Sequence, residues 1–411
     1  MTDGVVLAHD YATQRGGAER VALLLAQAFP GSPMYTTLHD PGGTFPDFAE
    51  VDLRTSALDR VGVLRRHHRL ALPLLPGAVD RHRVAGDVLL ASSTGWAHGY
   101  RGARRTVVYC HAPARWLYQS ERYLGAHAPA GGAADRLRAL AARAALAALA
   151  PGLRDWDRRA AARADVYLAN STVTRDAVRA AYGIEAEVLA PPPALSPDGP
   201  ERAPRALGAA AREDTEGGDP DGHLLCVARL LPYKNVDVVV EAALRAGRRL
   251  VVVGDGPDRS RLAGLAARGR PGQVRLVGRV DDPELRWLYR HATLLVAASY
   301  EDYGLTPLEA GAFGKPVAAL RAGGYLDTVA AGINGVFFDD VTPDGVAGAV
   351  ESALTVRWDA RTVRKHVDGF GTPRFLERLR QVVGAQVDLA RGGAAVTPPV
   401  SPVRIEGAGV R

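Results

Sequence analysis

Residues 5–28, VVLAHDYATQRGGAERVALLLAQA, contain the unit from which the rest of the fold is built. The apolar run from Val5 to Asp10 predicts a buried strand, and Gly16-Gly17 predicts a turn after it. A helix is expected next, because apolar residues recur on one face: Val21, Leu24, Leu25 and Ala28. A strand followed by an amphipathic helix is the repeating unit of a mainly parallel sheet.

The same alternation of strand and helix patterns continues along the chain in two series. Further strands of the first series are predicted at Asp87–Ser92, Thr106–His111 and Val166–Ser171. Ser171 can cap a helix that runs to Gly183, and the Ala-, Arg- and Leu-rich residues 133–164 predict a long helix that carries no chemistry. The second series begins at His223–Leu230 and continues with RLVVVGDG, QVRLVGRV, ATLLVAAS and KPVAAL.

The length of 411 residues and the Pro-, Gly- and charge-rich composition after residue 190 predict two domains. The expected division is a first domain at 1–190, a linker or insertion at 191–222, a second domain at 223–365, a C-terminal helix at 366–392 and a disordered tail at 393–411. Both domains are expected to be doubly wound and α/β. Because ligands of open parallel sheets bind at the carboxyl ends of the strands, we expect the chemistry to face a cleft between the domains.

Composition narrows the function class only in part. The net charge of +6 permits anionic partners, and the 47% hydrophobic content is that of an ordinary globular protein. Cys110 and Cys226 form neither a disulfide framework nor a metal-ligand spacing, which suits a reducing compartment. The first residues lack the features of a signal peptide, and no apolar run reaches the length of a membrane span. We therefore expect a cytoplasmic protein, soluble or peripheral on the inner face of the membrane.

Positive charge is concentrated in residues 51–83, which hold seven arginines and three aspartates. Three interpretations remain open: a solvated face, an anionic lipid surface, or a nucleic-acid surface. The stretch has no interleaved aromatics and no zinc ligands, so no nucleic-acid partner is expected. The apolar residues 70–76, LALPLLP, make a lipid-linked acceptor plausible.

The strongest local motif is SYEDYGLTPLEAGAFGKPV, residues 299–317. Thr306 suits the N-cap of a helix, Pro307 its first position, and Glu309 would complete a capping box, which is a purely structural interpretation. The alternative is a diphosphate site, because free backbone N–H groups near Gly304–Thr306 bind an anion without a metal. Glu301 and Glu309, one on each side, would then accept hydrogen bonds from two sugars, a hexose and a ribose.

Three further features have both a functional and a structural interpretation. Arg229 and Lys234 in VARLLPYKN can neutralise a leaving diphosphate, or they are surface cations. His111 in YCHAPARWLY follows a predicted strand at its ligand-binding end, or it is a buried structural imidazole. Gly16-Gly17 permits close approach of the backbone to a ligand, or only a tight turn, and it does not fit the GxGxxG fingerprint.

Together and in this order, the motifs resemble those of retaining glycosyltransferases of family 4, and within them bacterial GDP-mannose-dependent mannosyltransferases of polysaccharide and glycolipid assembly. The resemblance covers residues 1 to about 385 apart from the linker. The matching segments are HDYATQRGGAER, YCHAP, VYLANS, VARLLPYKN, VVVGDGP, VGRVDD, EDYGLTPLEA, GGYLDTV and NGVFF. The implied fold is GT-B, with the helix around Arg374 to Val387 returning to the first domain.

The resemblance implies a role for each of these residues. Arg229 and Lys234 would bind the donor diphosphate, Glu301 the transferred sugar and Glu309 the ribose hydroxyls. Backbone groups of Gly304, Leu305 and Thr306 would hold phosphate or sugar. His111 would lie beside the reacting carbon, and Gly16 and Gly17 would face the diphosphate.

The resemblance also implies transfer with retention of configuration, no cofactor and no metal. GDP-mannose is the expected donor, a UDP-sugar the alternative, and a glycan or lipid-linked molecule the acceptor. Asp327 in GGYLDTV stands where the family has a glutamate, which bears on sugar specificity. Three other functions stay open: epimerisation or sugar-phosphate synthesis on the same fold, non-catalytic sugar binding, and nucleic-acid binding.

Overall fold

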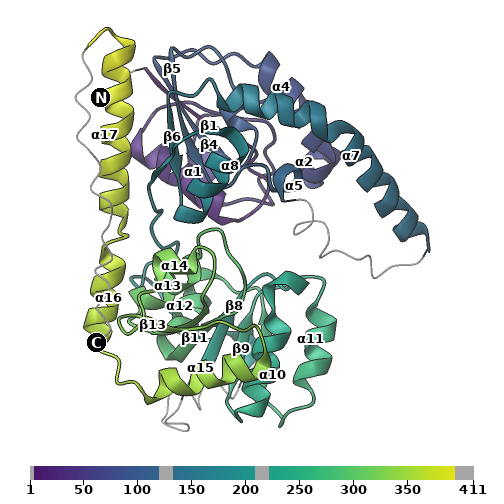
Figure 1. Ribbon diagram of the computed structural model, residues 1–411, viewed down its shortest axis with the longest axis vertical. Coiled ribbons are helices and arrows are strands. Elements are labelled where there is room, and N and C mark those ends of the chain that lie inside the picture. The colour runs from purple at the N-terminus through teal and green to yellow at the C-terminus, as the bar shows by residue number, and fades with distance from the viewer. Residues whose placement is uncertain (1–3, 120–132, 209–221, 394–411) are drawn as a thin grey trace. The chain divides into compact units, whose positions relative to one another are not determined.

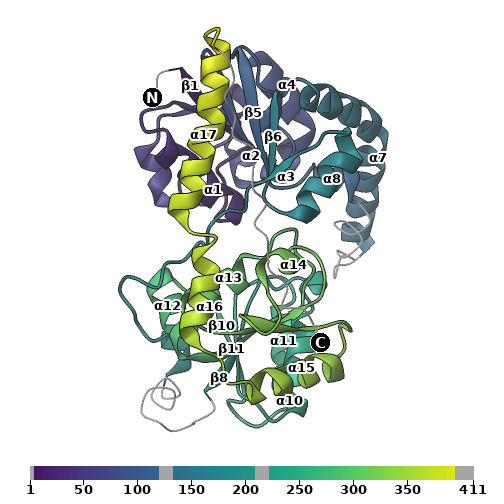
Figure 2. The ribbon, with the colours of Figure 1, turned by 60° about the vertical axis from the view of Figure 1, so that its left-hand side comes forward.

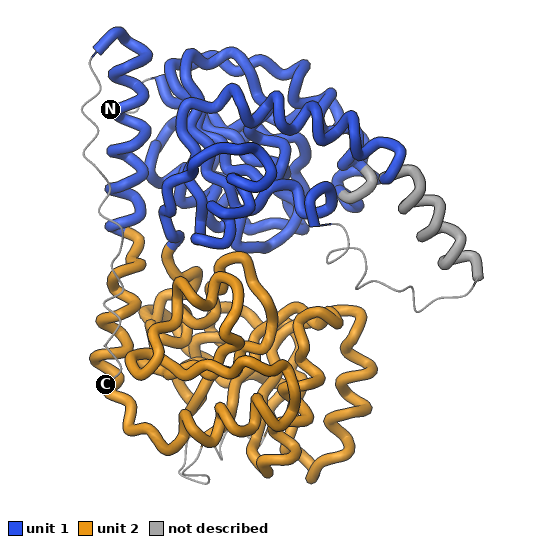
Figure 3. The backbone as a smooth tube through the Cα atoms, in the orientation of Figure 1, with its two compact units in different colours: residues 1–191, 373–402 blue, residues 192–372, 403–411 orange. Residues whose placement is uncertain are grey.

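The computed structural model describes residues 4–119, 133–208 and 222–393 (Figure 1). The described residues form two compact units: unit 1 comprises those of 4–191 and 373–393, and unit 2 comprises those of 192–372 (Figure 3). Each unit contains one parallel sheet, which confirms the predicted α/β class with two Rossmann-like sheets.

The sheet of unit 1 has seven parallel strands in the order β3-β2-β1-β4-β5-β6-β7. Its strands are β1 (Val5–His9), β2 (Met34–Thr36), β3 (Leu53–Thr55), β4 (Val88–Ser93), β5 (Arg105–Cys110), β6 (Val166–Ala169) and β7 (Glu187–Val188). Its helices are α1 (Gly17–Ala28), α2 (Gly62–Arg66), α3 (His68–Ala71), α4 (Leu75–Arg81), α5 (Arg115–Tyr118), α7 (Ala133–Ala161), α8 (Thr172–Tyr182) and α17 (Thr372–Ala390).

Helices cover both faces of this sheet, which explains why its central strands are continuous apolar runs. Val5 and Leu7 of β1 pack with residues of α1 and α17 on one face. Figure 2 shows the ribbon from the side of α17. The alternating residues Val6 and Ala8 pack on the other face, against α4 and part of α7. Successive side chains of β1 therefore contact the helices on opposite faces of the sheet.

The sheet of unit 2 has six parallel strands in the order β10-β9-β8-β11-β12-β13. Its strands are β8 (His223–Val227), β9 (Leu250–Val253), β10 (Val274–Gly278), β11 (Ala292–Ala297), β12 (Val317–Leu320) and β13 (Gly335–Phe338). Its helices are α10 (Val236–Arg245), α11 (Arg259–Ala266), α12 (Asp282–His291), α13 (Leu305–Ala312), α14 (Tyr325–Thr328), α15 (Pro343–Thr355) and α16 (Ala360–Asp368).

Local signals placed several elements correctly. The hydroxyl of Ser171 accepts a hydrogen bond from the N–H of Thr174 at 3.0 Å, and Gly183 ends α8 in the left-handed conformation with φ of 70°. Three strands of unit 1 were not predicted, namely β2, β3 and β7, because they are only two or three residues long. The strand β3 lies within the arginine-rich stretch.

The segments expected at the domain boundaries are only partly described. Residues 192–208 pack on unit 2, where Leu195 and Leu207 belong to its core. Residues 209–221 and the tail from 394 lie outside the described residues. The single helix expected over 366–392 is wrong: α16 ends at Asp368 and α17 begins at Thr372. Glycine is a weak helix former, and Gly369 and Gly371 occupy the break. Within the described ranges, no helix has both the length and the apolar character to cross a bilayer.

Candidate active site

The predicted glutamate motif follows the carboxyl end of β11 and leads into α13. Its Glu301 side chain, 27% exposed, interacts with two buried neighbours. The hydroxyl of Ser299 donates a hydrogen bond to Oε1 of Glu301 at 2.5 Å, and the ammonium group of Lys234 donates to the same oxygen. A lysine and a carboxylate in direct contact offer both a cation for phosphate and an acceptor for sugar hydroxyls.

Strand order brings Lys234 to this motif. Lys234 ends the short 3-10 helix η6 (Pro232–Lys234), which follows β8, and β8 pairs with β11. The next residue, Asn235, has φ of 53°, and its side-chain amide donates to the carbonyl oxygen of Ala298 at 2.9 Å. This hydrogen bond fixes the loop after β8 beside the loop after β11.

Arg229 lies in the same loop but is not brought to Glu301. Its side chain is exposed, and its guanidinium donates to the hydroxyl of Tyr233 at 3.3 Å. The loop itself is held tightly by the VVVGDGP motif. A Cβ on Gly254 would lie 1.9 Å from the carbonyl oxygen of Ala228, so no side chain fits at that position. The VARLLPYKN and VVVGDGP motifs thus pack directly against each other at the carboxyl edge of the sheet.

The capping-box prediction for Glu309 is wrong. Helix α13 begins at Leu305 with Gly304 as its N-cap and no side-chain cap, so Thr306 is already within the helix. The reason is that Gly304 takes the left-handed conformation, with φ of 85°, and starts the helix earlier than Thr306 would. Glu309 is instead buried, and the hydroxyl of Tyr289 donates to its Oε2 at 2.7 Å.

Two tyrosines that sequence reasoning missed hold this motif. Burial, and then the charge of Glu309, raises the pKa of Tyr289 well above its ordinary value, so the phenol stays a donor. The hydroxyl of Tyr325 lies 3.2 Å from Oγ of Ser299. A Cβ on Gly304 would lie 2.5 Å from the Tyr325 ring, so only glycine permits this contact.

The double glycine before Tyr325 packs on the glutamate loop. The N–H of Gly324 donates to the carbonyl oxygen of Glu301 at 2.8 Å. A Cβ on Gly323 would lie 2.4 Å from that oxygen, and one on Gly324 would lie 2.3 Å from the backbone of Tyr303. The two glycines of the GGYLD motif therefore permit the close packing that fixes the position of the Glu301 backbone.

In unit 1, His111 belongs to a buried cluster at the carboxyl ends of β1, β4 and β5. Its Nε2 lies 2.9 Å from Oγ of Ser92, which in turn lies 3.0 Å from Nδ1 of His9. Burial, followed by the neighbouring His9 and Arg115, lowers the pKa of His111 to about 3. Burial also lowers the pKa of His9, so both rings are neutral near pH 7.

Asp10 is a further residue that sequence reasoning did not single out. Its buried carboxylate accepts hydrogen bonds from the backbone N–H groups of Thr94, Trp96 and Ala97, at 2.5, 3.0 and 2.6 Å. These contacts order the loop that follows β4, next to Ser92. The rule that ligand-binding residues follow parallel strands would have pointed to His9, Asp10 and Ser92.

Gly16 and Gly17 lie at the start of α1. Gly16 is the N-cap in an extended conformation, with φ of −141°, and Gly17 is the first helical residue. A Cβ on Gly16 would lie 2.6 Å from a carboxylate oxygen of Glu19, so this position is crowded by the first turn of its own helix. No left-handed turn requires either glycine.

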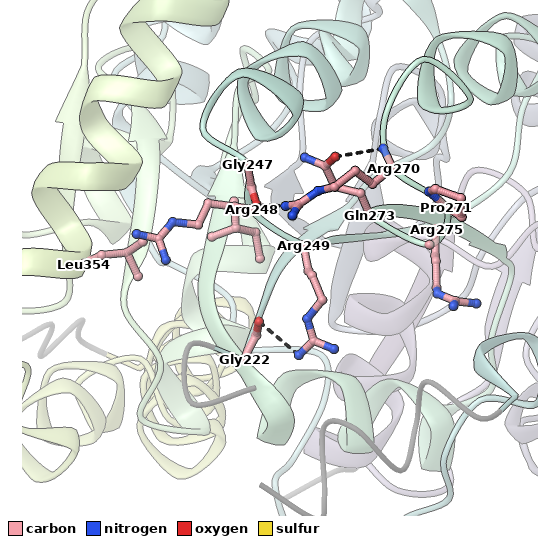
Figure 4. Close-up of a pocket in the computed structure, with 11 residues that line it drawn as sticks. Gly222, Gly247, Arg248, Arg249, Arg270, Pro271, Gln273, Arg275 and Leu354 are labelled. Atoms are coloured by element: carbon pink, nitrogen blue, oxygen red, sulfur yellow. Dashed lines mark hydrogen bonds between the residues drawn. The ribbon is translucent and has the colours of Figure 1, made fainter. Parts of the chain in front are cut away.

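A pocket of 390 Å³ in unit 2 lies away from these motifs (Figure 4). Gly222, Arg249 and Gln273 line it and directly precede β8, β9 and β10, so the pocket is at the amino edge of the sheet. Its arginines diverge in Figure 4: Arg248 extends toward Leu354 and Arg249 toward Gly222. The motifs of Lys234 and Glu301 are at the opposite, carboxyl edge, and the pocket is not the candidate active site.

Residues 210–366 match the family model described as Glycosyl transferases group 1. Over 135 residues the chain is 37% identical to the glycogen synthase of Pseudomonas aeruginosa, and this match covers 32% of this chain and 26% of that protein. Over 162 residues it is 39% identical to D-inositol 3-phosphate glycosyltransferase 2 of Catenulispora acidiphila, covering 35% of this chain and 38% of that protein. The chain thus spans less than half the length of these curated relatives.

Solved structures match over most of the chain. HepE of Anabaena in complex with UDP-glucose has a TM-score of 0.62 at 17% identity, and the match covers 93% of this chain and 99% of that one. WaaG, a glycosyltransferase involved in lipopolysaccharide biosynthesis, has a TM-score of 0.57 at 18% identity, over 95% and 100% of the two chains. At these identities the likeness establishes the fold. We conclude that the chain has the GT-B fold and that residues 210–366 are similar to the glycosyl transferases group 1 family.

Proposed function

We propose that the chain is a nucleotide-sugar-dependent glycosyltransferase of family 4 that transfers a hexose, mannose in the first instance, to a glycan or lipid-linked acceptor of the cell envelope. The observation that carries this proposal is the contact between Lys234 and Glu301 beside the start of α13, within the segment that matches the family. A cation, a carboxylate and free backbone N–H groups are what a sugar diphosphate needs.

The proposed roles follow from these groups. Lys234, Arg229 and the N–H groups of residues 304–306 bind the diphosphate and stabilise the leaving group. Glu301 accepts hydrogen bonds from the transferred sugar, and Glu309, held by Tyr289, accepts them from the ribose. These groups supply the positive charge without a metal, so we propose a metal-independent reaction with no cofactor.

We further propose that transfer retains the anomeric configuration. No carboxylate of the motif set is an obvious nucleophile for the far face of the sugar. The leaving phosphate oxygen can instead accept the proton of the acceptor hydroxyl while the new glycosidic bond forms on the same face. Catalysis then depends on positioning and electrostatic stabilisation, and for His111 and the Gly16-Gly17 turn we propose contacts with the bound donor.

GDP-mannose is the first candidate donor and a UDP-sugar the second, the latter favoured by the UDP-glucose complex of HepE. A thermal-shift screen against GDP, UDP, ADP and their sugar conjugates, without added metal, tests the donor site and identifies the base. Product analysis with the stabilising donor then tests transfer. A nucleotide-sugar that is converted with no glycoside formed would favour epimerisation or another reaction of the fold.

We propose that the acceptor is a glycan or a lipid-linked molecule. We also propose that the enzyme binds an anionic membrane surface. In the arginine-rich stretch, Val61 and Val63 are 48% and 53% exposed and flank the start of α2, and Leu74 is 51% exposed. Exposed arginines accompany them, Arg60 and Arg66. Apolar and cationic side chains together suit a surface of anionic lipid.

Co-flotation with vesicles of phosphatidylglycerol and phosphatidylcholine tests this surface. We expect binding that rises with the anionic fraction and falls in the Val61→Asp/Val63→Asp variant, whereas Leu149→Asp, at another exposed leucine of unit 1, should leave it unchanged. Equal binding to neutral and anionic vesicles, or none at all, would remove the membrane proposal without affecting the donor site.

A further inference from the structure

His9, Ser92 and His111 form a continuous hydrogen-bonded chain at the ends of three adjacent strands. The three residues are 2%, 0% and 6% exposed. The Ser92 hydroxyl lies between the two rings, 3.0 Å from Nδ1 of His9 and 2.9 Å from Nε2 of His111. The pairing of β1 with β4 and of β4 with β5 fixes these strand ends. The three hydrogen-bonded side chains are therefore held by the sheet itself.

The Ser92 hydroxyl carries one hydrogen, so it donates to one ring and accepts from the other. Two arrangements are therefore open. In the first, His9 donates from Nδ1 to Ser92, and Ser92 donates to Nε2 of His111. In the second, His111 donates from Nε2 to Ser92, and Ser92 donates to Nδ1 of His9. A neutral imidazole carries one hydrogen, so the choice also decides which nitrogen of His111 is protonated.

The environment of His9 decides between the two arrangements. Its Nε2 is buried, and no hydrogen-bond partner is found for it within residues 4–119, 133–208 and 222–393. In the second arrangement this nitrogen carries the hydrogen, and a buried N–H would be left without an acceptor. Orphaned buried donors are rarer and costlier than a bare lone pair. The first arrangement leaves only a lone pair there, so it is favoured.

The first arrangement fixes the state of His111. Its Nε2 accepts from Ser92, so its single hydrogen is on Nδ1. In the described part of the chain, Nδ1 of His111 has no hydrogen-bond partner and, unlike Nε2 of His9, is not fully buried, so a hydrogen there is not cut off from solvent or a ligand. The ring therefore presents an N–H donor on the side opposite Ser92, where a hydroxyl or phosphate oxygen of a ligand can accept it.

We propose that His9 and Ser92 are positioning residues that hold His111 as the neutral Nδ1–H tautomer. His111 then donates a hydrogen bond to the bound nucleotide-sugar and does not act as a base. The statement about the sugar donor rests on the proposed function, and the statement about the tautomer does not. The same strand provides a control, because Ser93 makes a separate contact with Nδ1 of His98 at 3.0 Å.

Nitrogen NMR of the full-length protein with 15N-labelled histidine tests the tautomer directly, with His111→Gln used to assign the signals. We expect a protonated Nδ1 and a bare Nε2 for His111 at pH 7.5. Loss of the Ser92 hydroxyl in Ser92→Ala should shift His111 toward a mixture of tautomers, whereas Ser93→Ala should leave its signals unchanged. A protonated Nε2 in the wild type, or no response to Ser92→Ala, would overturn the proposal.

Activity provides the second readout. We expect Ser92→Ala to lower kcat/KM about tenfold, the loss that corresponds to one oriented hydrogen bond, with Ser93→Ala near the wild type. His9→Asn keeps a donor near the position of Nδ1 and should retain more activity than His9→Leu, with folding checked by circular dichroism. If the wild type transfers no sugar, the proposed function fails, and the NMR result still decides the tautomer.

Discussion

The ammonium group of Lys234 donates a hydrogen bond to Oε1 of Glu301, although the two residues are 67 positions apart. Lys234 is buried to 9% exposure, while the Glu301 side chain keeps 27%. A lysine in such a place is paired before any ligand arrives, because an isolated buried charge is costly. The pair therefore holds both groups in place, and in the proposed function a bound diphosphate would replace Glu301 as the partner of Lys234 while the sugar would hydrogen-bond to Glu301.

The first prediction concerns this pair. Lys234→Ala and Glu301→Ala should each lower transfer by about 100-fold or more, because Lys234 is proposed to stabilise the charge of the leaving diphosphate and Glu301 to hold the transferred sugar in position. Steady-state kinetics with the donor found by thermal shift would measure this loss. Arg245→Ala is the matched control, since Arg245 pairs with Asp344 at the surface of the same unit. Full activity in either site variant, with the control also active, would remove the assignment.

A second prediction separates donor binding from the chemical step. Tyr289→Phe removes the hydroxyl that donates to Glu309 at 2.7 Å. We expect weaker binding of the nucleotide, by roughly tenfold, and a smaller change in kcat, because Glu309 is proposed to bind the ribose and not the reacting carbon. Isothermal titration with the nucleotide gives the affinity. Tyr118→Phe, which removes a comparable hydrogen bond to Asp157 in unit 1, should leave the affinity unchanged.

A third prediction tests the packing of the double glycine. Gly324 has an ordinary helical φ of −68°, so alanine there meets no backbone strain, only the backbone of Tyr303 at 2.3 Å. Gly324→Ala should displace the glutamate loop, lower stability by about 1–3 kcal/mol and reduce activity. Gly348→Ala is the control: it lies in α15 with nothing within 4 Å, and should stabilise by about 0.5–1 kcal/mol. Denaturant unfolding compares the two variants.

Sequence patterns predicted the strands and helix ends that are determined by residues close together in the sequence. The strands β1, β4, β5, β6 and β8 to β12 were found because short, mainly apolar runs of four to six residues form a local signal. The capping of α8 by Ser171 was found for the same reason. The start of α13 was misplaced, since the left-handed conformation of Gly304 depends on packing against Tyr325.

The candidate residues of each unit were named from the sequence, but their contacts were not. Glu301, Lys234 and His111 were named from their motifs. Their partners Ser299, Tyr325 and Ser92 lie in a loop, a helix and a strand, and although Ser299 and Tyr325 belong to quoted motifs, the sequence does not tell which side chains they contact. Strand order, which sequence spacing does not provide, decides that the loop after β8 meets the loop after β11.

The last prediction concerns pH and the neutral state of His111. Its pKa in the folded protein is lowered to about 3, below the ordinary value of 6.5, mainly by burial. A group with a lowered pKa of this kind binds its proton more readily in the unfolded chain, so protonation favours unfolding. The contribution of neutral His111 is complete above about pH 6.5 and is lost as the pH falls from 6.5 toward 3, by about 1.4 kcal/mol per pH unit. Unfolding of the wild type and of His111→Gln should be compared at pH 7.5 and 5.5. We expect the variant to lose about 1 kcal/mol less than the wild type between the two conditions, and an equal loss in both would mean that the folded protein accepts a proton on His111.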